Sequence, residues 1–227
     1  MSSRRLASHP LTRGAVRWLR RRDSRSSSER YLLESREPKL HVGCGRYSLE
    51  GWLNADIELR YRNVDIFLDA REPLPFEDGQ FHFVFAEHLL EHVSFDDGRR
   101  FLKEVRRVLR PGGVVRISTP DLEFLLRYYS DSSPAAEEYT DYHGREFIRK
   151  EVRSRAMVIS NFFYDFGHRL IYDWDLLVRV LEEAGLRGVE RRQVGESPHE
   201  ALRGIEQHGH HYPFNVEESM VAEAVKP

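Results

Sequence analysis

The chain has 227 residues, of which 40% are hydrophobic and 32% are charged, and its formal net charge is -2. This length suits one large domain with extensions, which buries enough surface to fold without disulfide or metal staples. A single cysteine, Cys44, excludes an internal disulfide framework, and no apolar run approaches the roughly 20 residues that span a bilayer. Composition thus excludes secreted miniproteins, membrane proteins and fibrous proteins, and predicts a soluble, cytoplasmic globular protein.

Charge is distributed unevenly along the chain. Residues 1–30 hold nine arginines against Asp23 and Glu29, a balance of +7, so the remainder carries -9. The sequence predicts that residues 1–38 form a basic N-terminal arm, loose or partly helical, with a short helix over Thr12–Arg21. Three roles stay open for this arm: docking on the domain, contact with nucleic acid or another acidic surface, and organelle targeting.

From Lys39 onward, short apolar runs alternate with segments of helical periodicity. We expect strands over residues 39–42, 52–57, 64–68, 81–86, 114–118, 188–194 and 220–225. One helix is expected from the capping residue Ser94 to the stop at Pro111-Gly112-Gly113, and another from Asp173 to Gly185. This alternation of strands and helices predicts an α/β fold with a mostly parallel sheet.

In a parallel sheet, ligands bind beyond the carboxyl ends of the strands. The first four predicted strands deliver Gly43-Cys44-Gly45, Asp56, Asp69-Ala70 and Glu87-His88-Leu89 at those ends. Glycines let a ligand approach the backbone closely, and a carboxylate accepts hydrogen bonds from ribose hydroxyls. Three acidic residues at successive strand ends predict a site for a nucleoside with a positively charged group, because they would repel a pyrophosphate.

These motifs resemble those of class I S-adenosylmethionine-dependent methyltransferases. The matching segments are, in chain order, Leu40–Gly45, Asp56, Asp69–Phe81, Glu87–Val93 and Leu109–Gly113. Looser matches at Gly167–Asp173 and Gly195–Ser197 are similar to small methyltransferases associated with sugar, polysaccharide or natural-product pathways. The resemblance covers about residues 39–226.

The resemblance implies a methyltransferase domain over residues 39–227. Its expected fold is a Rossmann-like, seven-stranded, mostly parallel sheet with helices on both faces and an antiparallel last strand. Residues 128–174 hold 11 of the 26 aromatic residues. An aromatic-rich helical insertion of about residues 122–172 is therefore expected between strands 5 and 6, on the substrate side.

The cofactor that the resemblance implies is S-adenosylmethionine, with S-adenosylhomocysteine as product. Gly43 and Gly45 are expected against its methionine part. Asp56 is expected at the ribose and Asp69 at the adenine amine. The other expected cofactor-binding residues are Cys44, Ile57, Ala70, Glu87, His88 and Leu89.

The sequence departs from the family pattern at three positions. His41 stands where an acidic residue is usual, Tyr47 where a third glycine is common, and His82 where an aspartate normally stands. Only 13 positions separate Gly43 from Asp56, so the first crossover helix is expected to be shortened to a turn or lost. The same short crossover argues against a dinucleotide-binding fold, which needs a full helix there.

The resemblance predicts transfer of a methyl group to a small-molecule acceptor, such as a sugar or natural-product hydroxyl. The predicted catalytic residues are His168, His92 and Tyr172, with His168 or His92 as a general base. We expect a monomer or homodimer whose partner is the acceptor rather than a nucleic acid or a membrane. Two alternatives stay open: a nucleic-acid-binding or RNA-modifying protein that uses the basic arm, and an inactive partner subunit.

No metal site is predicted from the sequence. The C-terminal histidines could offer ligands, but no cysteine or carboxylate pattern completes a set of three or four. A surface loop is the preferred interpretation of this cluster. Its members are His199, His208, His210 and His211.

Overall fold

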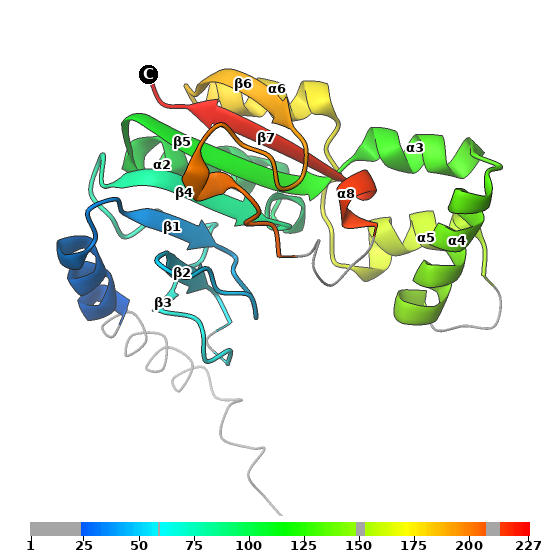
Figure 1. The fold of residues 1–227 in the computed structure, drawn as a ribbon, viewed down its shortest axis with the longest axis horizontal. Coiled ribbons are helices and arrows are strands. Elements are labelled where there is room, and N and C mark those ends of the chain that lie inside the picture. Colours follow the sequence, from blue (N-terminus) through cyan, green and yellow to red (C-terminus); the bar gives the residue numbers. More distant parts are fainter. Residues whose placement is uncertain (1–23, 59, 149–152, 208–213) are drawn as a thin grey trace, which may run out of the picture.

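The computed structural model describes residues 24–58, 60–148, 153–207 and 214–227. A seven-stranded sheet in the order β3-β2-β1-β4-β5-β7-β6 forms its centre (Figure 1). The strands are β1 (Lys39–Val42), β2 (Leu53–Asp56), β3 (Ile66–Phe67), β4 (Phe81–Glu87), β5 (Leu109–Pro120), β6 (Arg187–Arg192) and β7 (Ser219–Val225). β7 pairs antiparallel with β5 and β6, whereas β1 to β5 pair in parallel. The predicted Rossmann-like, mostly parallel sheet with an antiparallel last strand is confirmed.

Two amphipathic helices cover one face of the sheet. α2 (Phe95–Val108) begins after Ser94, whose hydroxyl accepts a hydrogen bond from the Asp97 amide as the sequence predicted. Asp173 caps α6 (Trp174–Glu183) in the same way. The apolar residues of both helices pack on alternate strand residues and form the main core of the molecule.

The other face of the sheet carries a buried polar row. Strand register places four polar residues in this row, with Phe85 between them: Asn54, His41, Arg116 and Glu223. Arg116 is fully buried, and its guanidinium lies 2.5 Å from a Glu206 oxygen and 2.6 Å from a Glu223 oxygen. Backbone carbonyls of Gln193 and Glu196 accept its remaining hydrogen bonds. The guanidinium therefore ties the chain after β6 to the sheet.

Non-helical chain covers this second face, where the resemblance implied further helices. Leu49 and Trp52 pack on it from the loop between β1 and β2, and Leu202 and Ile205 pack from residues 193–207. Residues 43–52 contain no helix, as the short spacing to Asp56 predicted. Within residues 193–207, one short 3-10 turn over Glu200–Leu202 interrupts an otherwise irregular segment.

β5 starts earlier than predicted. The Pro111-Gly112-Gly113 stop does end α2, whose last residue is Val108. β5 nevertheless begins at Leu109, before this stop. Its pairing with β4 shifts register before Val114. Gly112 has a φ of +75°, which residues with a β-carbon rarely adopt, and its amide donates to the Lys226 carbonyl. The three residues thus form a bulge within the strand rather than a connection before it.

A helical insertion follows β5 and lies beyond the carboxyl ends of the parallel strands (Figure 1). It comprises α3 (Leu122–Ser130), α4 (Pro134–His143), α5 (Arg155–Ser160) and the π-helical turns Gly144–Ile148 and Asn161–Asp165. Tyr128, Tyr139 and Phe162 lie buried in its own core. α8 (Asn215–Glu218) leads into β7. The predicted aromatic-rich insertion between strands 5 and 6 is confirmed.

Within the described part of the N-terminal arm, residues 24–34 form a helix that docks on the domain. The Phe67 amide donates to the Ser24 hydroxyl at 2.7 Å, and the Tyr31 hydroxyl donates to the Lys39 and Gly51 carbonyls. Residues 1–23, which include the predicted helix Thr12–Arg21, lie outside the described residues.

Within the described ranges, no helix has the length and apolar character needed to cross a membrane.

We expect Arg116→Leu to lower the free energy of unfolding by about 3–5 kcal/mol, because two buried carboxylates lose their shared guanidinium. Arg110→Leu, at an exposed position of the same strand, should change it by less than about 0.5 kcal/mol. Urea unfolding followed by circular dichroism measures both. Equal stability of the two variants would contradict the anchoring role of Arg116.

Candidate functional site

The loops that leave β1, β2 and β3 lie side by side at the carboxyl edge of the sheet. The Gly43 and Cys44 amides both donate to the Ala55 carbonyl, at 2.8 and 3.2 Å. The Leu68 amide donates to the Asp56 carbonyl at 3.1 Å. β4 pairs with β1 on the other side, so its loop joins the same edge. The predicted cofactor-binding segments therefore converge.

Asp56 fixes the shape of the glycine loop. One carboxylate oxygen accepts the Gly45 amide at 2.8 Å, and the other accepts the Glu58 amide at 2.7 Å. A carboxylate has more acceptor positions than these two bonds occupy, so Asp56 keeps capacity for ribose hydroxyls. Ile57, the next residue, is 43% exposed and adds an apolar surface beside it.

The two glycines of this loop differ in their surroundings. A β-carbon built on Gly43 would lie 3.1 Å from the Leu89 side chain, whereas one built on Gly45 would meet no atom within 4 Å. Both residues have positive φ angles, +76° and +53°. Close approach of a ligand to the backbone is therefore open at Gly45. At Gly43 the Leu89 side chain occupies the direction of a β-carbon, and contact of the Gly43 backbone with the methionine part stays a prediction.

Asp69 is held by an ion pair with a neighbour in its own loop. The Arg71 guanidinium donates to both carboxylate oxygens at 2.8 Å. This pair orients the Asp69 carboxylate at the end of β3, and its contact with an adenine amine stays a prediction. Ala70 is buried in the main core.

Two polar residues, His41 of β1 and Glu87 of β4, lie on the second face of the sheet. His41 is 2% exposed, with a ring nitrogen 3.3 Å from the Asn54 side-chain oxygen. Burial lowers the pKa of His41 to about 4, so the ring is neutral near pH 7 and cannot pair with an amine as an acidic residue would. Glu87 is also buried, and it accepts the Gln207 amide at 2.9 Å. Both residues thus have structural partners, and contact of Glu87 with the methionine part stays a prediction.

A second group of side chains gathers in the loop after β4. His88 has a φ of +47°, a left-handed conformation uncommon outside glycine. Its Nδ1 lies 3.0 Å from a Glu91 oxygen and its Nε2 lies 3.2 Å from the Ser219 hydroxyl. The Thr119 hydroxyl donates to the other Glu91 oxygen at 3.0 Å. This strained residue therefore points its ring at a fully buried carboxylate.

His88 and Glu91 hold each other in the charged state. Burial disfavours the charge on His88, but the hydrogen bond and charge of Glu91 outweigh it and raise the pKa of His88 to about 9. Burial likewise disfavours the charge on Glu91, yet His88 keeps the pKa of this carboxyl below its usual value. The pair places an ionised carboxylate inside the protein.

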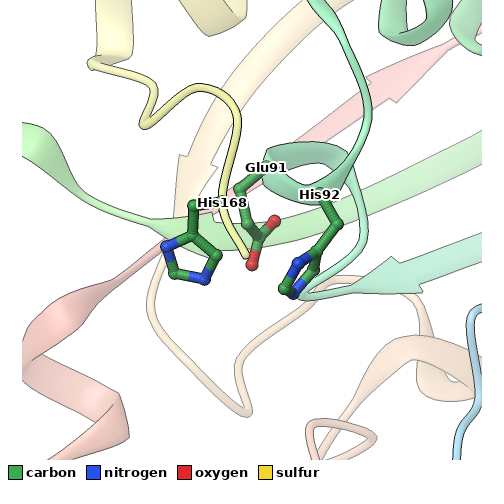
Figure 2. Close-up of side chains that lie close together, drawn as sticks. All are labelled: Glu91, His92 and His168. Atoms are coloured by element: carbon green, nitrogen blue, oxygen red, sulfur yellow. The ribbon is translucent and has the colours of Figure 1, made fainter. Parts of the chain in front are cut away.

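His92 and His168 lie next to this carboxylate (Figure 2). Their ring centres are 4.9 Å apart. The backbone brings the two segments together, because the Arg169 amide donates to the Glu91 carbonyl at 2.7 Å. Burial lowers the pKa of His168 despite the nearby Glu91 charge, which leaves this ring neutral at neutral pH. The structure thus brings two of the three predicted catalytic residues together.

Tyr172 does not belong to this group. It is 1% exposed, and a β-carbon built on Gly98 of α2 would lie 3.1 Å from its hydroxyl. Burial raises the pKa of Tyr172 to about 12. The spacing from His168 suggested one helical face, but Tyr172 forms a β-bridge with Asp121, so this segment is extended. The prediction of a catalytic Tyr172 is corrected, since its ring lies in the core.

Residues of the loop after β4 and of the insertion line a cavity of about 420 Å³. His88, His92 and His168 line its sheet side. The aromatic residues that line its other side are Tyr142, Phe147, Phe162 and Phe166. Phe147 and Phe162 come from the two π-helical turns, a distortion often found at functional sites. Other aromatic residues of the insertion turn elsewhere, and Tyr164 is 80% exposed.

Sequence reasoning missed a polar pair on the far wall of this cavity. His143 Nε2 lies 3.6 Å from a Glu218 oxygen, and the Tyr139 hydroxyl donates to the same oxygen at 2.5 Å. No spacing signal joins residues 143 and 218, because they meet only where the insertion folds back beside α8. Of the predicted C-terminal histidines, His199 packs against Phe83. The other three lie outside the described residues.

Residues 40–117 match the family model described as a methyltransferase domain. That segment runs from β1 into β5 and includes all the edge loops described above. Residues 40–117 therefore carry a methyltransferase domain of the class I S-adenosylmethionine-dependent type.

Curated relatives match shorter parts of the chain. A probable S-adenosylmethionine-dependent methyltransferase of Mycolicibacterium smegmatis is 39% identical over 67 residues, which cover 30% of this chain and 25% of that protein. An uncharacterized protein of Methanocaldococcus jannaschii is 24% identical over 122 residues, which cover 50% of this chain and 58% of that protein. The chain thus spans about a quarter to somewhat over half of the length of such relatives.

Solved methyltransferase structures share the fold over most of the chain. An S-adenosylmethionine-dependent methyltransferase from Archaeoglobus fulgidus superposes with a TM-score of 0.51 at 15% identity, covering 90% of this chain and 92% of that one. This similarity shows that the methyltransferase fold extends well beyond the family match.

The edge loops of this methyltransferase domain fit S-adenosylmethionine, the cofactor of the class. The open side of Gly45 and the unused acceptor positions of Asp56 suit the backbone approach and the ribose. Ile57 is exposed next to Asp56, and its contact with the cofactor stays a prediction. Cys44 fits as a small buried residue that lets the loop turn tightly, without a chemical role.

Asp56→Ala is expected to weaken binding of S-adenosylhomocysteine by about 1.5–3 kcal/mol, because hydrogen bonds to a charged group are lost. Part of that loss would come from the glycine loop, whose Gly45 amide loses its acceptor. Calorimetric titration measures the affinity, with Asp78→Ala at a site remote from the edge loops as the control. Unchanged affinity in Asp56→Ala would refute the assignment.

Cys44 should be nearly inert toward alkylation in the folded protein. Burial, together with the charges of Asp56 and Asp65, raises the pKa of its thiol to about 12, and only the thiolate is nucleophilic. We expect iodoacetamide at pH 8 to modify it at least about 100-fold more slowly than in urea. Mass spectrometry of timed samples measures both rates, and similar rates would contradict the buried position.

Proposed function

We propose that this chain methylates a hydroxyl group of a small molecule, such as a sugar or another natural product, bound in the 420 Å³ cavity. The supporting observation is that one loop serves both the cofactor edge and the cavity. Gly45 is open toward the cofactor side, and the next two residues, Arg46 and Tyr47, line the cavity. An acceptor in the cavity would therefore lie beside the methionine end of the cofactor.

The chemistry of the cavity walls supports a small, partly polar acceptor. Its volume falls in the range of about 300–1,000 Å³ that is typical of small-molecule sites. Aromatic rings of the insertion provide flat apolar surfaces for a ring-shaped acceptor. His168 on one side, and Glu218 on the other, provide polar groups that can orient its hydroxyls.

The bound cofactor supplies a methyl group made reactive by a positively charged sulfur. The residues that line the cavity would hold the acceptor oxygen in line with that methyl group, and such positioning can lower the barrier by about 7–11 kcal/mol. A neutral His168 can accept the hydroxyl proton, which adds about 10²–10⁴-fold in rate. The negative charge of Glu91 then stabilises the imidazolium that forms.

The test combines cofactor binding with a search for the acceptor. Thermal unfolding with S-adenosylmethionine or S-adenosylhomocysteine should show stabilisation of about 2.7 kcal/mol at about 100 times the dissociation constant. A panel of sugars and hydroxylated natural products is then assayed for methylation by mass spectrometry. Failure of both compounds to stabilise the protein would contradict the proposal. Binding without transfer to any member would favour an inactive partner subunit.

His168→Gln should lower turnover by about 10²–10⁴-fold while leaving the affinity for S-adenosylhomocysteine within about twofold, because His168 lines the cavity and not the glycine loop. His199→Gln serves as the control, since this histidine packs against Phe83 on the second face. Initial rates with the acceptor found above measure turnover, and calorimetry measures affinity. Loss of cofactor affinity in His168→Gln would contradict a role confined to the acceptor.

A further inference from the structure

Three side chains with metal-ligating atoms converge on the sheet side of the cavity. One nitrogen each of His92 and His168 and one oxygen of Glu91 all lie within 4.8 Å of one another. Figure 2 shows the Glu91 carboxylate between the two imidazole rings. Ligands of a tetrahedral zinc ion, at about 2.1 Å from the metal, stand about 3.4 Å apart. Small side-chain rotations would therefore complete the geometry.

The backbone holds these ligands together across the chain. Arg169 and Leu170 both donate their amides to the Glu91 carbonyl, at 2.7 and 3.4 Å. This clamp joins the loop before α6 to the turn after β4. Gly167, with a φ of +79°, provides the bend that brings His168 alongside His92. The cluster is thus built into the fold and does not depend on long, mobile side chains.

Neighbouring groups orient the carboxylate ligand. Thr119 and His88 each contact one oxygen of Glu91, at 3.0 Å in both cases, and Ser219 in turn contacts His88. Carboxylates that bind metals in proteins are held in this way by outer hydrogen bonds. Each oxygen keeps further acceptor positions, so these contacts are compatible with a bound ion.

We propose that Glu91, His92 and His168 bind a divalent transition-metal ion, with Zn²⁺ as the best-suited ion. Two imidazoles and one carboxylate form a typical three-ligand zinc set, which leaves one position for water or substrate. Mg²⁺ and Ca²⁺ prefer oxygen ligands and suit this set less well. Because all three histidines on this side line the cavity, the fourth position would face the acceptor.

The ion would activate the acceptor hydroxyl, and this role rests on the proposed function. A hydroxyl oxygen bound to the ion loses its proton more readily. The O–H bond breaks, the electron pair stays on the oxygen, and the proton passes to water. When the ion is bound, His92 and His168 are its ligands and do not accept the proton. Proton transfer to His168, as described above, applies to the protein without the ion.

Titration of the 227-residue chain with ZnCl₂ and CoCl₂, after removal of metal with a chelator, tests the site. We expect one ion per chain, visible absorption bands of a four- or five-coordinate Co²⁺, and loss of affinity by more than about 100-fold in His92→Gln and His168→Gln. These two variants are preferred to a Glu91 variant, which could fail to fold. Far-ultraviolet circular dichroism confirms that they are folded.

Two control variants separate this site from other histidines. His199→Gln and the double variant His210→Gln/His211→Gln should keep the ion and the Co²⁺ spectrum. Retention of the ion in His168→Gln, its loss in the double variant, or the absence of ion binding to the unmodified chain would overturn the proposal. Binding of S-adenosylhomocysteine, measured in parallel, tests the proposed function independently of the ion.

Discussion

The buried, ionised carboxylate of Glu91 is the interaction on which the acceptor side of this protein depends. A charge inside a protein is tolerated only when hydrogen bonds and an opposite charge replace water. Here Thr119 and His88 supply them, and the strained backbone of His88 keeps its ring in place. The carbonyl of the same glutamate receives the Arg169 amide, so one residue fixes both the charge and the position of His168.

Irregular chain, in place of helices, covers the second face of the sheet in this domain. The connection between β1 and β2 is too short for a helix, which would normally bury that side of the sheet. A polar row with Arg116 lies there beside a small apolar cluster, and two irregular segments cover both. Irregular chain has backbone groups that need partners, and the buried guanidinium satisfies two of its carbonyls. Polar side chains on this face therefore replace the internal hydrogen bonds of a helix.

The same short connection links the cofactor edge to the cavity. Without a helix after the glycine loop, Arg46 and Tyr47 remain at the carboxyl edge of the sheet and line the acceptor cavity. The Asp56 carboxylate fixes the glycine loop by accepting a hydrogen bond from the Gly45 amide. The departures from the family pattern at Tyr47 and His41 thus have separate consequences. Tyr47 becomes part of the cavity wall, whereas His41 joins the buried polar row.

The sequence by itself determined the α/β class, the strands, the capped helices α2 and α6, and the loops that meet at the carboxyl edge. These features are local, because periodicity, capping residues and glycine positions act over a few neighbouring residues. Only the tertiary structure decided which side chains share a space. It put Leu89 over Gly43, moved Tyr172 into the core and joined His168 to Glu91. Each of these outcomes depends on contacts between segments far apart in the chain, which no short-range pattern encodes.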